Sequence, residues 1–244
     1  MFSDKYKDDL VIFSLKKTAI ISLFSAVMLT SVSVSSFEVQ LNGTINAENK
    51  AVDNSESEAN TIKRSLMHKL ATLEFFSANF NQQVLDADGN ELQNALGTLV
   101  VQKPNLVHWK TAEPDESLIV SDGLTLWFFD PFVEQVSAYL LEKALMNTPI
   151  LLLTSSDPSM WQHYSVSSMN ENNYLIHAND NNAQVKTLEL RFEEGSNVLD
   201  SFTILDATGQ LSIFKLSQFD VEKSPENSQF IFEIPEGVEL DDQR

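Results

Sequence analysis

The 244-residue sequence contains no cysteine. This absence excludes disulfide bonds, thiolate metal sites, cysteine nucleophiles and a lipid-modified N-terminal cysteine. Glycine is scarce, with seven residues in the chain, and no GxGxxG or phosphate-binding loop occurs. A GxSxG nucleophile elbow and an HExxH zinc motif are also missing. The sequence therefore carries none of the common nucleotide-binding, zinc or hydrolase signatures.

Positive charge is scarce as well. The chain has 16 Lys and Arg against 35 Asp and Glu, which gives a net charge of −19. No basic stripe is available to meet phosphates, so a nucleic-acid partner is excluded. The same charge should repel an anionic membrane surface, although solubility alone would also explain it.

Ionisable residues show no catalytic or metal-binding pattern. The four histidines, His68, His108, His163 and His177, have no second ligand at metal-binding spacing. The carboxylates fall in turns and on expected surfaces, and no glycosidase pair can be identified. The residues themselves therefore identify neither a metal site nor a catalytic group.

The N-terminal region has the features of an export signal. Lys16 and Lys17 precede an apolar run at 18–34, and two small residues, Ser35 and Ser36, follow. This order predicts a cleaved signal peptide over 1–36; the alternative is an uncleaved membrane anchor, for which the run is short. Its removal would leave 12 basic and 32 acidic residues, a net charge of −20. An exported, cysteine-free chain fits a bacterial periplasm.

The rest of the chain divides into a lead-in and one domain. Residues 37–60 are polar and acidic without a sustained period, which predicts a flexible lead-in. No internal repeat or second boundary interrupts residues 61–244. Ile62, Leu66, Leu70 and Leu73 then predict an amphipathic helix over 61–73.

A period of two replaces the helical period after residue 75. Turn signals bound candidate strands at 76–84, 92–102, 105–111, 117–121, 124–129, 164–169, 174–178, 184–193, 198–206, 211–220 and 229–233, with 133–139 as a further candidate. The spacing of about ten residues predicts one antiparallel meander of about eleven strands. A sheet of that length must curl or close.

Residues 140–163 break the strand pattern. The Asn147-Thr148-Pro149 sequence predicts a helix entry with proline in the first turn. Asp157 and Pro158 predict the start of a second short helix. These two helices, with the helix at 61–73, are available to cover the concave face of the curved sheet. We thus expect a mainly β fold with a lid of short α-helices.

Apolar and aromatic side chains are the remaining candidates for function. Any single one is more often part of a structural core than of a binding site. Together they can line a hydrophobic cavity that holds an acyl chain. The candidates are Leu66, Leu70, Phe76, Phe80, Leu106, Val107, Trp109, Trp127, Phe129, Phe132, Ile150, Leu152, Leu153 and Trp161.

Four motifs resemble one known family. VQKPNLVHWK at 101–110, PDES-LIVSDG-TLWFFDPFVEQ within 114–135, NTP at 147–149 and PEGVELDDQR at 235–244 are similar to LolA, the periplasmic outer-membrane lipoprotein carrier. The resemblance runs from about residue 61 to residue 244. It implies an unclosed β-barrel with a helical lid over a hydrophobic cavity.

The resemblance also implies a function and its partners. A LolA protein accepts lipoproteins from the inner-membrane LolCDE transporter, shields their acyl chains and passes them to the receptor LolB, without cofactor or catalysis. A monomer is expected. The family commonly has arginine before the proline of the first motif, where it hydrogen-bonds the lid; Lys103 stands there in this chain, so the resemblance implies that Lys103 is the lid latch.

Two other classes of protein remain alternatives. A periplasmic sensor with an RseB-like half-barrel would share the fold, but such proteins add a second domain. A hydrolase with a dispersed site would need a nucleophile, and none is evident in the sequence.

Overall fold

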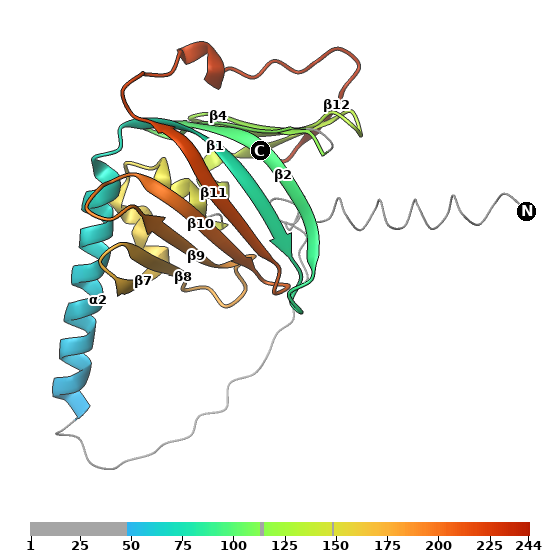
Figure 1. Cartoon of the computed structure of the whole chain (residues 1–244). Coiled ribbons are helices and arrows are strands. Elements are labelled where there is room, and N and C mark those ends of the chain that lie inside the picture. Colours follow the sequence, from blue (N-terminus) through green and yellow to red (C-terminus); the bar gives the residue numbers. More distant parts are fainter. Residues whose placement is uncertain (1–47, 113–114, 148) are drawn as a thin grey trace, which may run out of the picture.

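A single twelve-stranded sheet dominates the computed structural model, which describes residues 48–112, 115–147 and 149–244 (Figure 1). The predicted signal peptide at 1–36 lies outside the described residues, as does the lead-in up to residue 47. The strands are β1 (Phe75–Leu85), β2 (Glu91–Gln102), β3 (Leu106–Thr111), β4 (Ser117–Asp122), β5 (Thr125–Asp130), β6 (Gln135–Leu140), β7 (Tyr164–Asn170), β8 (Asn173–Ala178), β9 (Val185–Phe192), β10 (Leu199–Asp206), β11 (Leu211–Asp220) and β12 (Glu239–Asp242).

The strands form an unclosed antiparallel barrel. Their order is β12-β6-β5-β4-β3-β2-β1-β11-β10-β9-β8-β7, so β12 and β7 are the two edges. Neighbours along the chain pair antiparallel, and β1 joins the two halves by pairing with both β2 and β11. Among the strands of the described residues, only β12 pairs parallel, with β6. The predicted mainly β, unclosed architecture is confirmed, with twelve strands where about eleven were expected.

Aspartate side chains define several of the turns. Asp86 Oδ1 accepts hydrogen bonds from the backbone N–H groups of Asp88 at 2.9 Å and Asn90 at 2.8 Å. Asp122 Oδ1 accepts from Leu124 at 2.9 Å and Thr125 at 2.8 Å in the β4–β5 turn. These carboxylates hold the backbone in the turn without help from the sheet, which is why the strand ends could be predicted locally.

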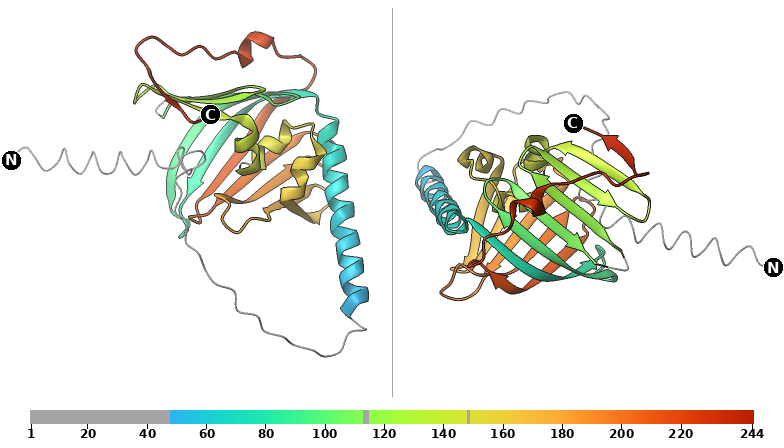
Figure 2. Two further views of the ribbon diagram at one scale, coloured as in Figure 1. Left: turned by 180° about the vertical axis from the view of Figure 1, so that it is seen from behind. Right: turned by 90° about the horizontal axis from the view of Figure 1, so that it is seen from above.

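Short helices cover the concave face of the sheet. They are α3 (Leu141–Asn147), η1 (Pro149–Leu153) and η2 (Pro158–His163), and Figure 2 shows them inside the curve of the sheet. Asp157 caps η2 by accepting a hydrogen bond from Ser159 N–H at 2.8 Å, and Pro158 occupies its first turn. The two predicted helix entries are present, but both helices are 3₁₀ rather than α, and α3 precedes them as a third helix.

The long helix α2 (Glu48–Ala71) runs beside β7 at one edge of the sheet (Figure 1). It begins 13 residues before the predicted start at Thr61, so residues 48–60 are helical where the sequence predicted a flexible lead-in. No glycine or proline occurs between Glu48 and Ala71. Once the amphipathic turns are fixed, extending a helix costs little per residue, so the helix continues through the polar segment. None of the described helices is long and apolar enough to cross a membrane.

The C-terminal segment, residues 221–244, crosses the convex face of the sheet. It contains η3 (Asn227–Phe230) and β12, and η3 contacts β3 and β4 (Figure 1). The strand predicted over 229–233 is wrong. The alternation there is real, since Phe230 is buried and Ile231 is 65 % exposed. It arises from packing on the face of the sheet and not from pairing at its edge.

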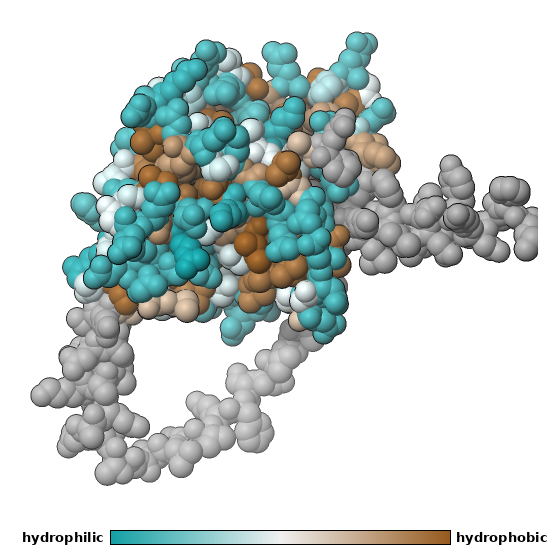
Figure 3. All heavy atoms as spheres, in the orientation of Figure 1, coloured by the Kyte–Doolittle hydropathy of each residue, from teal (hydrophilic) through white to brown (hydrophobic). Residues whose placement is uncertain are grey.

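Two separate apolar regions result, one on each face. Most buried apolar residues form one cluster between the concave face and the helices. On the convex face, the buried residues Val100, Val120, Val136, Ala138 and Phe230 lie outside that cluster. Elsewhere, the face shown in Figure 3 is mostly hydrophilic, with smaller apolar patches.

Candidate functional site

The concave face is lined by every second residue of the central strands. In β1 these residues include Phe76 and Phe80, which lie opposite Val101 and Gly97 of β2. The same register continues across β3, where Leu99 of β2 lies opposite Trp109. Because side chains of paired residues point to the same face, these residues form a continuous apolar surface.

Four aromatic rings make the centre of this surface. Trp109 lies 5.4 Å from Phe80, 5.9 Å from Phe202 and 5.1 Å from Phe214, between ring centroids. Phe202 and Phe214 stack at 4.4 Å from neighbouring strands β10 and β11. The four rings therefore join the two halves of the sheet across β1.

Gly97 allows this arrangement. A Cβ atom at residue 97 would lie 2.2 Å from Phe80 Cζ and 2.2 Å from the carbonyl oxygen of Lys110. Both distances are far below van der Waals contact, so the ring of Phe80 can lie over β2 only because residue 97 has no side chain.

Helices α2, α3, η1 and η2, here called the covering layer, close the concave face. Leu66 and Leu70 of α2, residues 150–153 of η1 and Trp161 of η2 all belong to the same buried cluster as the strand residues. Four consecutive buried residues in η1 show that this short helix is enclosed on all sides. The side chains of the covering layer thus pack directly against the sheet.

Ten of the fourteen candidate residues from the sequence come together in this interior, which we call the interior cluster. Nine are buried and Trp109 is partly buried. They are Leu66, Leu70, Phe76, Phe80, Val107, Trp109, Ile150, Leu152, Leu153 and Trp161. Phe202 and Phe214 belong to the same cluster and were missed, although the alternation of β10 and β11 marked them as inward-facing.

The structure does not bring the other four candidates into the interior. Leu126 and Phe128 are the members of β5 that belong to the buried cluster, so the intervening Trp127 points to the convex face, as does Phe129. Leu106 has the opposite parity to the inward-facing Val107. Phe132 lies in the β5–β6 turn and is 68 % exposed.

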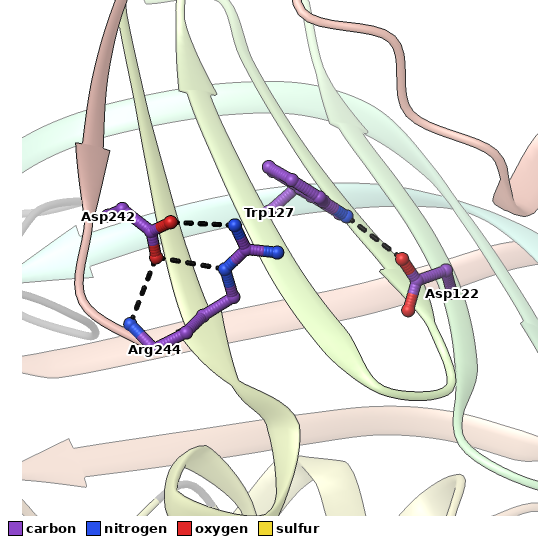
Figure 4. A network of polar contacts seen from close by, with 4 residues as sticks. All are labelled: Asp122, Trp127, Asp242 and Arg244. Carbon is purple, nitrogen blue, oxygen red and sulfur yellow. Dashed lines mark hydrogen bonds and ion pairs between the residues drawn. The ribbon is translucent and has the colours of Figure 1, made fainter.

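Trp127 and Phe129 instead hold the C-terminal segment. Phe232 stacks on Trp127 at 5.5 Å and contacts Phe129 at 6.1 Å, between ring centroids. Figure 4 shows the polar side of this region: Trp127 Nε1 donates to Asp122 at 3.1 Å, and Arg244 binds Asp242 through two guanidinium nitrogens and its backbone N–H. The Arg244 guanidinium also lies over the Trp127 ring at 5.2 Å.

Lys103 contacts the covering layer through α2. Its ammonium donates to the carbonyl oxygen of Leu70 at 2.6 Å, in the last turn of that helix. Burial lowers the pKa of Lys103, and the nearby Glu74 carboxylate opposes the shift. The ammonium therefore satisfies a helix C-terminal carbonyl, which favours a cation.

Contact with η1 comes from the backbone two residues later. Asn105 N–H donates to the carbonyl oxygen of Thr154 at 2.9 Å, just after η1. The side-chain oxygens of Gln102 and Asn105, which flank Lys103 and Pro104, are two of four buried polar atoms without a hydrogen-bond partner among the described residues. Closure at this turn thus leaves two buried oxygens without hydrogen bonds, and this makes the closed state less stable.

Lys63 makes a further connection that the sequence did not reveal. Its ammonium donates to the carbonyl oxygen of Trp161 in η2 and, at 2.8 Å, to that of Tyr164. Lys63 precedes Leu66 of the apolar stripe by three residues, but no local signal in the sequence showed which group its ammonium would meet.

The described residues contain no group of three or more His, Asp or Glu side chains that could hold a metal ion. The chemistry of the interior is that of aliphatic and aromatic surface held between strands and helices by a few backbone hydrogen bonds. Such an interior suits an apolar ligand that enters when the covering layer moves.

Comparison with known proteins finds one family, both by its family model and by individual relatives. The family model described as outer membrane lipoprotein carrier protein LolA matches residues 71–233. An outer-membrane lipoprotein carrier protein of Aeromonas salmonicida is 44% identical over 180 residues, which cover 74% of this chain and 88% of the relative. That of Vibrio cholerae is 40% identical over 186 residues, covering 75% of this chain and 90% of the relative.

Among solved structures, a LolA superfamily protein from Nitrosomonas europaea aligns with a TM-score of 0.45 and 14% identity, covering 71% of this chain and 97% of the other.

Proposed function

We propose that this chain, which belongs to the LolA family of outer-membrane lipoprotein carrier proteins, carries lipoproteins by holding their acyl chains between the sheet and its covering layer. The observation that carries this proposal is the interior cluster, in which one apolar surface is shared between a rigid sheet and short helices. The acyl chains would contact its ten residues from the sequence list together with Phe202 and Phe214. The carrier domain comprises residues 61–244.

The energies of entry and exit are balanced. An acyl chain with about 15 CH₂ groups gains about 12 kcal/mol when it leaves water. Exposing the four aliphatic side chains of η1 costs about 6 to 12 kcal/mol. Since the two values are of the same order, an acyl chain can displace η1 and can be displaced by it. A carrier needs this reversibility, whereas a storage protein would not.

The cycle uses the contacts at the Lys103 turn. In the closed state Lys103 and Asn105 hold α2 and η1, respectively, through backbone carbonyls. Cargo entry breaks these bonds, and their re-formation helps to expel the cargo. No catalytic step is part of this function, and no cofactor is required.

Membership of the family supports the partners and the location that we propose. The chain accepts lipoproteins from the inner-membrane LolCDE complex, whose ATP hydrolysis supplies the energy, and delivers them to LolB at the outer membrane. It acts in the periplasm as a monomer, after a signal peptide at 1–36 has directed export and been cleaved.

A release assay tests this proposal. Spheroplasts that carry labelled lipoprotein are incubated with the purified mature protein, and the soluble fraction is analysed by native mass spectrometry. We expect a one-to-one complex of protein and lipoprotein. A soluble fraction without labelled lipoprotein would contradict the carrier function.

A variant of the interior provides the matched control. Leu152→Asp places a charge among the buried residues and should abolish the complex, whereas Leu124→Asp, at an exposed turn position, should leave it intact. Circular dichroism must show that both variants are folded. Equal release by both folded variants would mean that lipoproteins bind elsewhere.

A further inference from the structure

Lys63 occupies the end of the buried stripe of α2. It precedes Leu66 by three residues and Leu70 by seven, so the three side chains lie along the same side of the helix. Leu66 and Leu70 are buried against the sheet, and Lys63 is partly buried. The aliphatic part of its side chain therefore continues the apolar stripe, and its ammonium extends beyond α2 to neighbouring elements.

The acceptors of Lys63 lie at a junction of the covering layer and the sheet. Trp161 belongs to η2, and Tyr164 is the first residue of edge strand β7. The carbonyl oxygen of Trp161 also accepts the backbone N–H of Tyr164, which ends η2. One ammonium thus joins α2 to the end of η2 and to the beginning of β7.

Backbone carbonyls, and not a carboxylate, hold this ammonium. Among the described residues, an ion pair joins Arg244 and Asp242, far from this site in the sequence. Burial lowers the pKa of Lys63, with no opposing charge among its causes. A charged group kept in such a place is stabilised mainly by its hydrogen bonds, and their loss would leave two carbonyls without this donor.

The two lysine contacts lie at different places along α2. Lys103 reaches Leu70 in the last turn, whereas Lys63 acts two turns earlier. Lys103 and Asn105 belong to the β2–β3 turn, and Asn105 holds the end of η1. Lys63 holds η2. The two short helices of the covering layer are therefore attached through different contacts.

We propose that Lys63 is a positioning residue that fastens η2 and the start of β7 to α2. The covering layer is then held on the sheet at two separate points, the β2–β3 turn and the start of β7. Opening at the β2–β3 turn frees η1, and opening at Lys63 frees η2 with Trp161. The inference rests on the proposed function only in taking this opening as the step that admits acyl chains.

Hydrogen exchange followed by mass spectrometry tests the proposal on the mature chain without lipoprotein. In Lys63→Met, amides of residues 159–166 should exchange about tenfold faster than in the wild type. Amides of η1 at 150–154 and of β10 should stay within about twofold, because other contacts hold them. Lys63→Arg should restore slow exchange, since its guanidinium can donate to the same carbonyls. Lys215→Met, at an exposed position of β11, is the control.

Each result decides the proposal. Unchanged exchange at 159–166 in Lys63→Met would overturn it. An equal increase in η2, η1 and β10 would also overturn it, because Lys63 would then support only global stability. If Lys63→Met does not fold, Lys63→Ala, which also removes the donor, is judged by the same criteria.

The exchange experiment is independent of cargo. If the wild type fails to release lipoprotein from spheroplasts, the carrier function fails while the exchange data still decide the role of Lys63. If the wild type releases lipoprotein and Lys63→Met exchanges like the wild type, only the inference about Lys63 is lost.

Discussion

Gly97 shows how a single missing side chain shapes the interior. An added Cβ would meet both the ring of Phe80 and the backbone of β3 at Lys110. The ring could rotate, but the carbonyl oxygen of Lys110 is fixed by the sheet. We predict that Gly97→Ala lowers the free energy of unfolding by about 2 to 3 kcal/mol, as for overpacking. Urea unfolding measures this.

Gly195 is the control for that substitution. It has φ +68°, and an added Cβ would have nothing within 4 Å. Gly195→Ala should therefore cost only the backbone strain of about 1 kcal/mol. If Gly97→Ala costs no more than Gly195→Ala, the close approach at Gly97 is not a constraint on the fold.

Tyr164 should make stability depend on pH in the alkaline range. Burial raises its pKa from 10.0 to about 12. The neutral phenol is thus favoured in the folded protein, so its contribution is complete below pH 10 and is lost as the pH rises toward 12. We predict that the free energy of unfolding, measured with urea, falls between about pH 9.5 and about pH 11.5. This range begins just below the tyrosine pKa of the unfolded chain, which is about 10.

Tyr164→Phe should remove most of that fall. Tyr139→Phe should remove a smaller part of it, because burial also raises the pKa of Tyr139 but the large rise is that of Tyr164. An unchanged pH dependence in Tyr164→Phe would show that another group is responsible.

Among elements, the β2–β3 turn controls the end of α2. Lys103→Leu removes the donor to Leu70 and leaves that carbonyl without it. In the proposed cycle, re-formation of this bond helps closure, so we predict about tenfold slower lipoprotein transfer to LolB for Lys103→Leu and near wild-type transfer for Lys103→Arg. Labelled lipoprotein passed to membranes containing LolB measures the rate.

Lys110→Leu, at an exposed position of the following strand, should transfer as the wild type does. Equal transfer by Lys103→Leu and the wild type would leave Lys103 as a residue with a structural contact and no role in transfer.

The C-terminal segment depends on two aromatic side chains. Phe230 is 2 % exposed, and the adjacent Ile231 is 65 % exposed. We predict that Phe230→Ala lowers the free energy of unfolding by about 3 kcal/mol, whereas Ile231→Ala changes it by less than about 0.5 kcal/mol. Thermal and urea unfolding of the two variants compare a buried and an exposed apolar residue of the same segment. Similar losses for both would mean that the segment does not pack on the sheet.

At the scale of the whole molecule, we expect the net negative charge to oppose contact with anionic membranes. The chain has a net charge of −19, and hydrophilic side chains cover most of the face in Figure 3. An increase from about 0.01 M to about 1 M salt shortens the Debye length from about 30 Å to about 3 Å. We predict that binding of the mature chain to anionic vesicles increases over this range, as measured by sedimentation.

Vesicles of uncharged lipid are the control, and binding to them should change little with salt. If salt has no effect on binding to anionic vesicles, the acidic surface does not keep the carrier away from membranes, and the charge serves solubility alone.

Local signals explain why most strands could be predicted. Asp86 and Asp122 form turns through their own carboxylates, and the alternation of Phe76 to Val84 is visible without a partner strand. The same alternation failed at 229–233, because packing on a sheet face and pairing in a ladder leave the same pattern. Helix α2 began earlier than predicted, because a polar segment can continue a helix that its neighbours have started.

The sequence by itself determined the strands, their turns, the apolar stripe of α2 and the resemblance to the LolA family, because each depends on residues close together in the chain. Only the tertiary structure decided which face Trp127 and Phe129 occupy, since the apolar run of β5 has both parities and the C-terminal segment covers the convex face. It also decided the partners of Lys103 and Lys63. An ammonium that binds backbone carbonyls leaves no complementary residue in the sequence, because every residue has such a carbonyl.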